Sequence, residues 1–237
     1  MARTFDDARR WTALGTGLVL RAAGGLDDTA YAGPSTLPGW SRAHVAAHVA
    51  ANAEALSRLV HWAATGEPTP MYASPEERAA GIARGRALPA DGLTAWLRES
   101  AGALEAGMDA LGEEQWRTPV VTAQGRTVPA TEVPWMRARE VCVHAVDLAS
   151  GVSFADLPDD FLAALCDDVV AKRSAAPGGP AVALGLPSGG AGWELPGDGE
   201  AALVTAELPA LAAYLTGRDA GPPAADGTPA PALGPWL

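Results

Sequence analysis

The stretch Pro134-Trp-Met-Arg-Ala-Arg-Glu-Val-Cys-Val-His-Ala-Val-Asp-Leu148 is the most informative part of this sequence. Its apolar residues recur at helical spacing, so the stretch predicts a largely buried helix. Glu140 and His144 are four residues apart and therefore share one face of that helix. A carboxylate and an imidazole on one rigid face can hold a metal ion together. The stretch therefore predicts a core helix that also carries part of a metal site.

A second helical segment offers partners for this pair. It reads Trp40-Ser-Arg-Ala-His-Val-Ala-Ala-His-Val-Ala-Ala-Asn52 and carries His44 and His48, from a total of 4 histidines in the chain. Three ligands from two helices would leave one coordination position open, as catalytic zinc requires. The same spacing is common for ordinary helical ion pairs, and either histidine could instead be a core residue bonded to a carbonyl or to a ligand.

Composition narrows the class of protein. The chain has 237 residues, of which 48% are hydrophobic, so it can bury a full core. Its net charge of -11 argues against nucleic acid as a partner. Its 2 cysteines, Cys142 and Cys166, form no CxxC motif, which fits a reducing cytosol. The N-terminus lacks a signal-type apolar core, and no run of about 18 apolar residues predicts a membrane span. We therefore expect a cytoplasmic protein.

Helical periodicity and capping signals divide the first part of the chain into helices. Ser41 is the predicted N-cap of a long helix that runs to Thr65 and ends at Gly66. Ser74 is a second predicted N-cap, because a proline follows it at the first helical position and a glutamate stands at the third. We expect helices over residues 5–26, 41–65, 75–88, 92–111 and 130–149, a loop over 27–40 and a short hairpin over 118–128.

The pattern of the sequence changes after Gly151. We expect a helix over residues 158–174, then a region punctuated by glycine and proline, and a closing helix over 209–216. Short apolar runs in the punctuated region predict strands of a small sheet, at 181–186, 192–195 and 201–206. The fold is therefore predicted as mostly α, with an N-terminal four-helix bundle over residues 1–152 and a small α+β domain with an extended tail over 153–237.

Several segments resemble the mycothiol-dependent maleylpyruvate isomerases, a family in the DinB-like superfamily of metal-binding helix bundles. The most specific matches are Leu37-Pro-Gly-Trp-Ser-Arg-Ala-His-Val-Ala-Ala-His48, Thr122-Ala-Gln-Gly-Arg-Thr-Val-Pro-Ala130 and the stretch quoted first. The resemblance is thin between residues 175 and 206. Further matched segments lie at residues 61–76, 214–218 and 235–237.

The resemblance implies a site. The family holds zinc through two histidines and a glutamate, which by motif position fall on His48, Glu140 and His144, so that His44 is not a ligand. It also uses an arginine of the C-terminal domain that faces the metal, and its matching position is Arg218. Arg126, in the Gln-Gly-Arg loop motif, is a second candidate for binding the substrate or the thiol cosubstrate, and bracing of the turn is its alternative role.

The resemblance also implies a reaction, the cis-trans isomerisation of maleylpyruvate to fumarylpyruvate in gentisate-type aromatic degradation. Adding the thiolate of mycothiol to the double bond gives a single bond that rotates, and expelling the thiolate then gives the trans product. Coordination to Zn²⁺ deprotonates a thiol, and a guanidinium such as that of Arg218 can stabilise the enolate or bind a substrate carboxylate. We therefore expect zinc and mycothiol as the cofactors.

Two other classes of function stay open. One is a zinc- and mycothiol-dependent S-transferase that acts on electrophiles or on a biosynthetic intermediate, with the same ligands. The other is a binding module without catalysis, which the complete ligand set argues against. The matches at residues 61–76 and 122–130 favour the isomerase. The expected partners are a dianionic small molecule and mycothiol, with no nucleic acid, no membrane and a monomeric chain.

Overall fold

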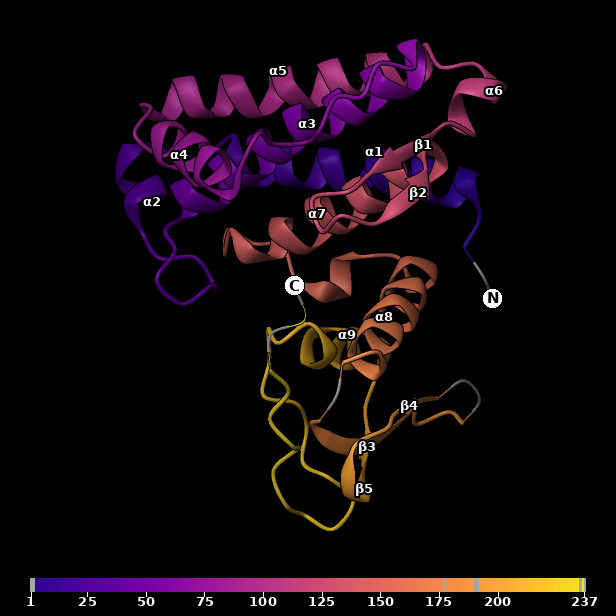
Figure 1. Cartoon of the computed structure of the whole chain (residues 1–237). Helices are drawn as coiled ribbons and strands as arrows, with labels where there is room; N and C mark the ends of the chain where they lie inside the picture. The colour runs from indigo at the N-terminus through magenta and orange to yellow at the C-terminus, as the bar shows by residue number, and fades with distance from the viewer. Residues whose placement is uncertain (1–2, 177, 190–191, 235, 237) are drawn as a thin grey trace. The chain divides into compact units, whose positions relative to one another are not determined.

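The computed structural model describes residues 3–176, 178–189, 192–234 and 236, and it divides the chain into two compact units. We call Arg3–Val152 the bundle unit and Ser153–Leu237 the C-terminal unit. The bundle unit is built almost wholly from helices, and the C-terminal unit combines helices with a small sheet (Figure 1). The predicted fold class, a mostly α chain with an α+β C-terminal part, is confirmed.

Four long helices form the bundle: α1 (Phe5–Ala23), α3 (Arg42–Thr65), α5 (Ala90–Asp109) and α7 (Val133–Asp147). Helix α1 packs along α7, while α3 contacts both α5 and α7 (Figure 1). Helix α3 is rich in alanine and buried on nearly every side, so its neighbours approach its backbone closely. The largest fully buried side chains of the bundle include Trp11, Leu56, Leu59, Leu93, Leu97 and Leu104.

The predicted helix caps are present. The Ser41 side chain accepts a hydrogen bond from the backbone of His44, and α3 ends at Gly66, whose φ of 76° is left-handed. Helix α4 (Pro75–Gly85) begins after its N-cap Ser74 but ends earlier than expected.

Other boundaries differ from the sequence-based expectation. The segment expected as a loop contains the short helix α2 (Asp28–Ala32), which the side chain of Asp27 caps. A second short helix, α6 (Glu113–Trp116), precedes the hairpin of β1 (Pro119–Val121) and β2 (Thr127–Pro129). Helices of one turn carry too few residues to show a periodicity, so the pattern missed them. The 3₁₀ turn η1 (Ala130–Glu132) then leads into α7.

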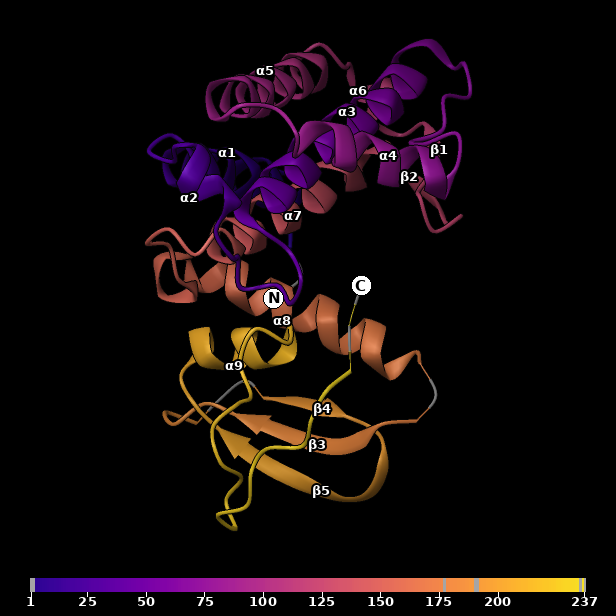
Figure 2. The ribbon, with the colours of Figure 1, turned by 90° about the vertical axis from the view of Figure 1, so that its left-hand side faces the viewer.

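The C-terminal unit places two helices on one face of a three-stranded sheet (Figure 2). After the 3₁₀ turn η2 (Phe154–Asp156), it runs through α8 (Asp159–Ser174), β3 (Pro180–Gly185), β4 (Trp193–Leu195), β5 (Asp198–Thr205) and α9 (Leu208–Leu215). The strand order is β4-β3-β5, with β4 antiparallel and β5 parallel to β3. The buried residues of the strands include Val182, Leu184, Trp193, Leu195 and Val204.

The tail after α9 follows the sheet edge, where Ala224 pairs with Val204 in a single bridge. The hydroxyl of Tyr214 donates to the carbonyl of Pro231 at 2.6 Å. Two residues of the matched motif at 235–237, Pro235 and Leu237, lie outside the described residues, as do positions 177, 190 and 191 of the strand region.

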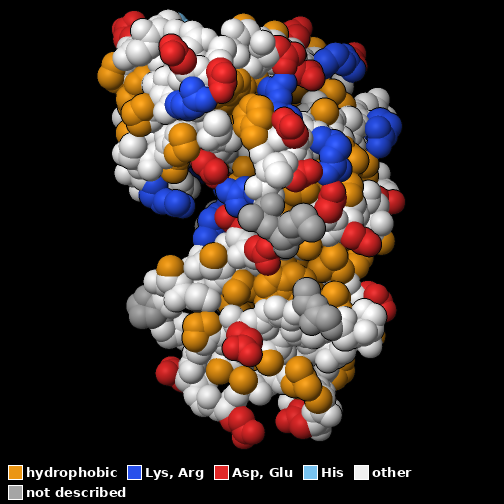
Figure 3. All heavy atoms as spheres, turned by 90° about the vertical axis from the view of Figure 1, so that its right-hand side faces the viewer, with side chains coloured by type: hydrophobic (Ala, Val, Ile, Leu, Met, Phe, Trp, Pro, Cys, Tyr) orange, Lys and Arg blue, Asp and Glu red, His pale blue; other side chains and the backbone are white. Residues whose placement is uncertain are grey.

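Charged side chains of both signs are interspersed on the bundle unit over the face drawn in Figure 3. In the part of the chain that the structure describes, no helix has both the length and the apolar character needed to cross a membrane.

Candidate metal centre

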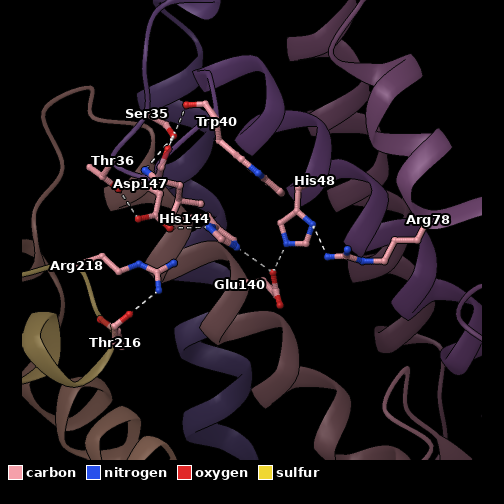
Figure 4. A network of polar contacts seen from close by, with 11 residues as sticks. Ser35, Thr36, Trp40, His48, Arg78, Glu140, His144, Asp147, Thr216 and Arg218 are labelled. Carbon is pink, nitrogen blue, oxygen red and sulfur yellow. Dashed lines mark hydrogen bonds and ion pairs between the residues drawn. The ribbon is translucent and has the colours of Figure 1, made fainter. Parts of the chain in front are cut away.

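Two neighbouring helices of the bundle bring His48, Glu140 and His144 together. His48 comes from the middle of α3, and the other two come from consecutive turns of α7. One donor atom from each residue lies within 4.8 Å of the other two. Figure 4 shows the three side chains converging from the two helices. The three residues assigned as ligands by resemblance therefore do meet in space.

One carboxylate oxygen is common to both imidazoles. Glu140 Oε2 lies 2.9 Å from His48 Nε2 and 3.3 Å from His144 Nε2. The two rings stand edge to face, with centroids 4.9 Å apart. All three side chains are largely shielded from solvent, with exposed fractions of 9%, 19% and 13% for His48, Glu140 and His144. Both histidines therefore present Nε2 to the same point.

The other ring nitrogen of His144 has a fixed partner. His144 Nδ1 lies 2.8 Å from Asp147 Oδ2, one helical turn further along α7. Asp147 is fully buried and accepts a second hydrogen bond from the hydroxyl of Thr36 at 2.6 Å. A carboxylate behind a histidine fixes the tautomer and leaves Nε2 as the atom that can bind a metal.

Burial and pairing shift the pKa values of the cluster in different directions. Burial by itself would raise the pKa of Glu140, but the charges and hydrogen bonds of His48 and His144 hold that pKa well below its usual range. Burial lowers the pKa of His48 more than Glu140 raises it. For His144, hydrogen bonds to Asp147 and Glu140 outweigh burial and raise the pKa to about 9. The cluster thus holds a carboxylate and two imidazoles in unequal environments.

His44 is separate from this cluster. Its Nδ1 lies 2.8 Å from the hydroxyl of Ser41 in the capping box of α3, and its Nε2 contacts the guanidinium of Arg86. Both ring nitrogens are therefore in use away from Glu140, and desolvation followed by the charge of Arg86 lowers the pKa of His44. The ring of Trp40 is close to both histidines, with its centroid 5.9 Å from that of His44 and 5.8 Å from that of His48.

A buried arginine lies one turn before Glu140. Arg137 is 1% exposed, and its Nη1 donates to the carbonyl of Val49 at 2.7 Å and to the Asn52 side chain at 2.9 Å. Burial lowers its pKa to about 10, while the charge of Glu140 opposes that shift. Arg137, Asp147 and Thr36 were not predicted as site residues from the sequence. Of the three, only Asp147 could have been found from the sequence, because it follows His144 by three residues and so lies on the same helix face.

The remaining residues of interest lie elsewhere. Cys142 is buried against α1, where its thiol donates to the carbonyl of Trp11, and Cys166 is buried in α8. Burial raises the pKa of both thiols, that of Cys166 to about 12.

Arg126 is exposed in the β1–β2 turn, and Arg218 follows α9, where its Nη1 donates to the carbonyl of Thr216 at 2.7 Å.

The donor set fits a divalent metal ion. Two imidazole nitrogens and one carboxylate oxygen are common protein ligands of zinc, and three of them leave a position for a further ligand. A carboxylate also matches the positive charge of the ion. The fold and the site together define the class of this protein: a helix bundle with a candidate metal centre in its core and an appended α+β unit.

The comparisons identify the family. The family model described as the mycothiol maleylpyruvate isomerase N-terminal domain matches residues 6–149, which is more than half of the chain. The chain belongs to the mycothiol maleylpyruvate isomerase family, and it is an enzyme. The family that the sequence motifs suggested is therefore confirmed.

Two solved structures are similar over nearly their whole length. They are a crystal structure of the mycothiol-dependent maleylpyruvate isomerase and one of its histidine-to-alanine mutant. Each is 35% identical in sequence with a TM-score of 0.93, and the alignment covers 99% of this chain and 98% of the other. The search of curated proteins found no match.

Proposed function

We propose that this chain isomerises maleylpyruvate to fumarylpyruvate and depends on mycothiol and a zinc ion. The observation that carries the proposal is the cluster of His48, Glu140 and His144, complete in a chain whose family and solved relatives bear the name of that reaction. When bound there, zinc would lower the pKa of a coordinated thiol so that the thiolate predominates near neutral pH.

The bundle residues have distinct roles in this proposal. His48, Glu140 and His144 hold the ion, and Asp147 orients His144 through its Nδ1. The two cysteines of the chain do not supply the nucleophile, because both are buried and burial raises the pKa of their thiols. The nucleophilic sulfur must therefore come from an added thiol, which fits a mycothiol-dependent reaction.

We assign Arg218 to the substrate. Its position matches the arginine of the family's C-terminal domain, and a guanidinium can stabilise the negative charge that thiolate addition places on the ketone oxygen. Arg126 is the second arginine in this proposal, as a contact for the substrate or for mycothiol. Its exposed side chain at the hairpin turn is compatible with that role. It is equally compatible with a residue that only braces the turn.

The test is an isomerase assay on the purified zinc-loaded protein, with and without mycothiol. We expect the ultraviolet absorbance of maleylpyruvate to convert to that of fumarylpyruvate only when mycothiol is present. The matched control is Cys142→Ala/Cys166→Ala, which should keep the same dependence on mycothiol. Formation of a stable thioether product with an electrophile, and no isomerisation, would instead identify an S-transferase.

A further inference from the structure

The two histidines of the metal centre differ at their second ring nitrogen. His144 Nδ1 faces a carboxylate oxygen of Asp147 at 2.8 Å. His48 Nδ1 faces Nη2 of Arg78 at 3.4 Å, and among the described residues no acceptor lies within hydrogen-bond distance of it. Figure 4 shows Glu140 and Arg78 approaching the His48 ring from different sides. The charged group beside His144 is therefore negative, and the charged group beside His48 is positive.

Arg78 is an exposed residue in the first turns of α4. Its guanidinium lies 6.0 Å from the ring centroid of the half-buried Tyr72, which supports it on one side. No carboxylate pairs with Arg78 among the described residues, whereas Arg3 and Arg117 have such partners. The charge of Arg78 therefore lies one imidazole ring away from the three ligand atoms and is not neutralised.

With a metal bound to His48, this arrangement of His48 and Arg78 would lack a hydrogen-bond acceptor. When Nε2 of a neutral imidazole binds a metal, the ring hydrogen stays on Nδ1, so His48 Nδ1 becomes a donor. A guanidinium also has donors only. Two donors directed at one place do not bond to each other, and together they bind an acceptor. A carboxylate is the acceptor that best matches a guanidinium and an adjacent N–H.

We propose that Arg78 and His48 Nδ1 together bind a carboxylate of the substrate, which makes Arg78 a specificity-determining residue within the bundle unit. The proposal rests on the proposed function. It adds to that function a carboxylate site that lies within the same unit as the ligands, in addition to the site assigned to Arg218.

The chemistry identifies which carboxylate this is. In a cis-enone diacid, the thiolate adds to the alkene carbon that bears a carboxylate, the new carbon–sulfur bond forms there, and the alkene electrons move to the ketone oxygen as an enolate. Loss of the thiolate returns those electrons to the carbon–carbon bond, so nothing is oxidised or reduced. The carboxylate on the attacked carbon stays beside the sulfur throughout. A guanidinium next to the metal ligands can hold that end while the ketone end rotates.

The test compares Arg78→Ala and Arg78→Lys with Arg84→Ala, which removes an exposed arginine from the same helix. We expect Arg78→Ala to lower kcat/KM about 10–100-fold, mostly through KM, because one charge-assisted hydrogen bond is lost. Arg78→Lys should recover part of the loss, and Arg84→Ala should match the parent. Zinc content, measured by elemental analysis, should be the same in all four proteins.

Two further measurements separate this inference from the proposed function. Calorimetric titration of the zinc-loaded proteins with maleate needs no turnover, and Arg78→Ala should bind maleate about tenfold more weakly than Arg84→Ala. An enone analogue with a methyl group in place of the carboxylate should react equally with Arg78→Ala and the parent. Equal maleate binding by both alanine variants would overturn the role of Arg78 even if the parent is an active isomerase. A parent that binds maleate through Arg78 but does not isomerise would overturn only the proposed function.

Discussion

Asp147 and His144 form a buried carboxylate–imidazole pair at the end of α7, with Oδ2 of one 2.8 Å from Nδ1 of the other. Asp147 has no exposed surface, and its remaining oxygen accepts the hydroxyl hydrogen of Thr36 from the segment before α3. The pair therefore links His144 of α7 to the loop that leads into α3, the helix of His48.

The first prediction concerns this pair. Asp147→Asn should weaken zinc binding about 10–100-fold, because the amide keeps the shape but loses the charge that holds the imidazole tautomer. Thr36→Val is the matched control, since it removes only the outer hydrogen bond and should weaken binding less. Competition with a chelator measures both affinities. Equal zinc affinity in Asp147→Asn and the parent would show that the pair is only structural.

The second prediction concerns the ligands themselves. His48→Ala and His144→Ala should purify without zinc, while His44→Ala should keep one ion per chain, because both ring nitrogens of His44 already contact Ser41 and Arg86. Elemental analysis gives the occupancy. Zinc retained in full by His144→Ala, or lost from His44→Ala, would contradict the ligand assignment.

The third prediction is a pH dependence of the metal-free protein. In the folded chain, hydrogen bonds to Asp147 and Glu140 raise the pKa of His144 to about 9, above the ordinary histidine value of 6.5 expected for the unfolded chain. The protonated ring therefore stabilises the fold fully below pH 6.5, and this contribution is lost as the pH rises through about 9. Denaturant unfolding should show the free energy of unfolding falling by on the order of 2–3 kcal/mol over that range. His144→Gln should remove this slope, and a slope that persists would assign it to another group.

The fourth prediction concerns Arg218. Arg218→Ala should cost about 2–4 kcal/mol of transition-state stabilisation, as for the loss of one preorganised partner of a developing negative charge. Zinc content and the thermal midpoint should change little, because the residues that we assign to the ion are His48, Glu140 and His144, and an arginine at a helix end contributes little to stability. Steady-state kinetics beside metal analysis provide the check. If Arg218→Ala has the same kinetics as the parent, Arg218 is only a charge at a helix end. Arg126→Ala should then be tested in the same way.

The fifth prediction tests the contact of α1 with α7. A Cβ atom at Gly15 would lie 2.6 Å from Cys142 Sγ and from a methyl carbon of Val141, so Gly15→Ala should destabilise the fold by about 1–3 kcal/mol. Gly17 is two residues away, and a Cβ there meets only Arg21 Nη1 at 3.4 Å. Gly17→Ala should therefore be neutral or stabilise by about 0.5–1 kcal/mol, because alanine favours the helix. Thermal unfolding distinguishes the two, and equal midpoints would contradict the close packing.

Sequence patterns predicted much of the fold because they report local chemistry. The caps at Ser41 and Ser74 and the stop at Gly66 depend on backbone groups within a few residues, so they could be recognised directly. The one-turn helices α2 and α6 were missed because so few residues show no period. The helix expected over residues 130–149 begins at Val133 instead, because Ala130–Glu132 form the 3₁₀ turn η1.

The candidate site shows where sequence alone stops. The spacing of Glu140 and His144 determined that they share a helix face, but that spacing left His44 and His48 equally open, and only family resemblance chose between them. The tertiary structure separates the two histidines, because packing of α3 on α7 turns His48 toward Glu140 and leaves His44 in its capping box. Contacts across about 100 residues of sequence, such as those of Thr36 with Asp147, follow from helix packing, which no local pattern encodes.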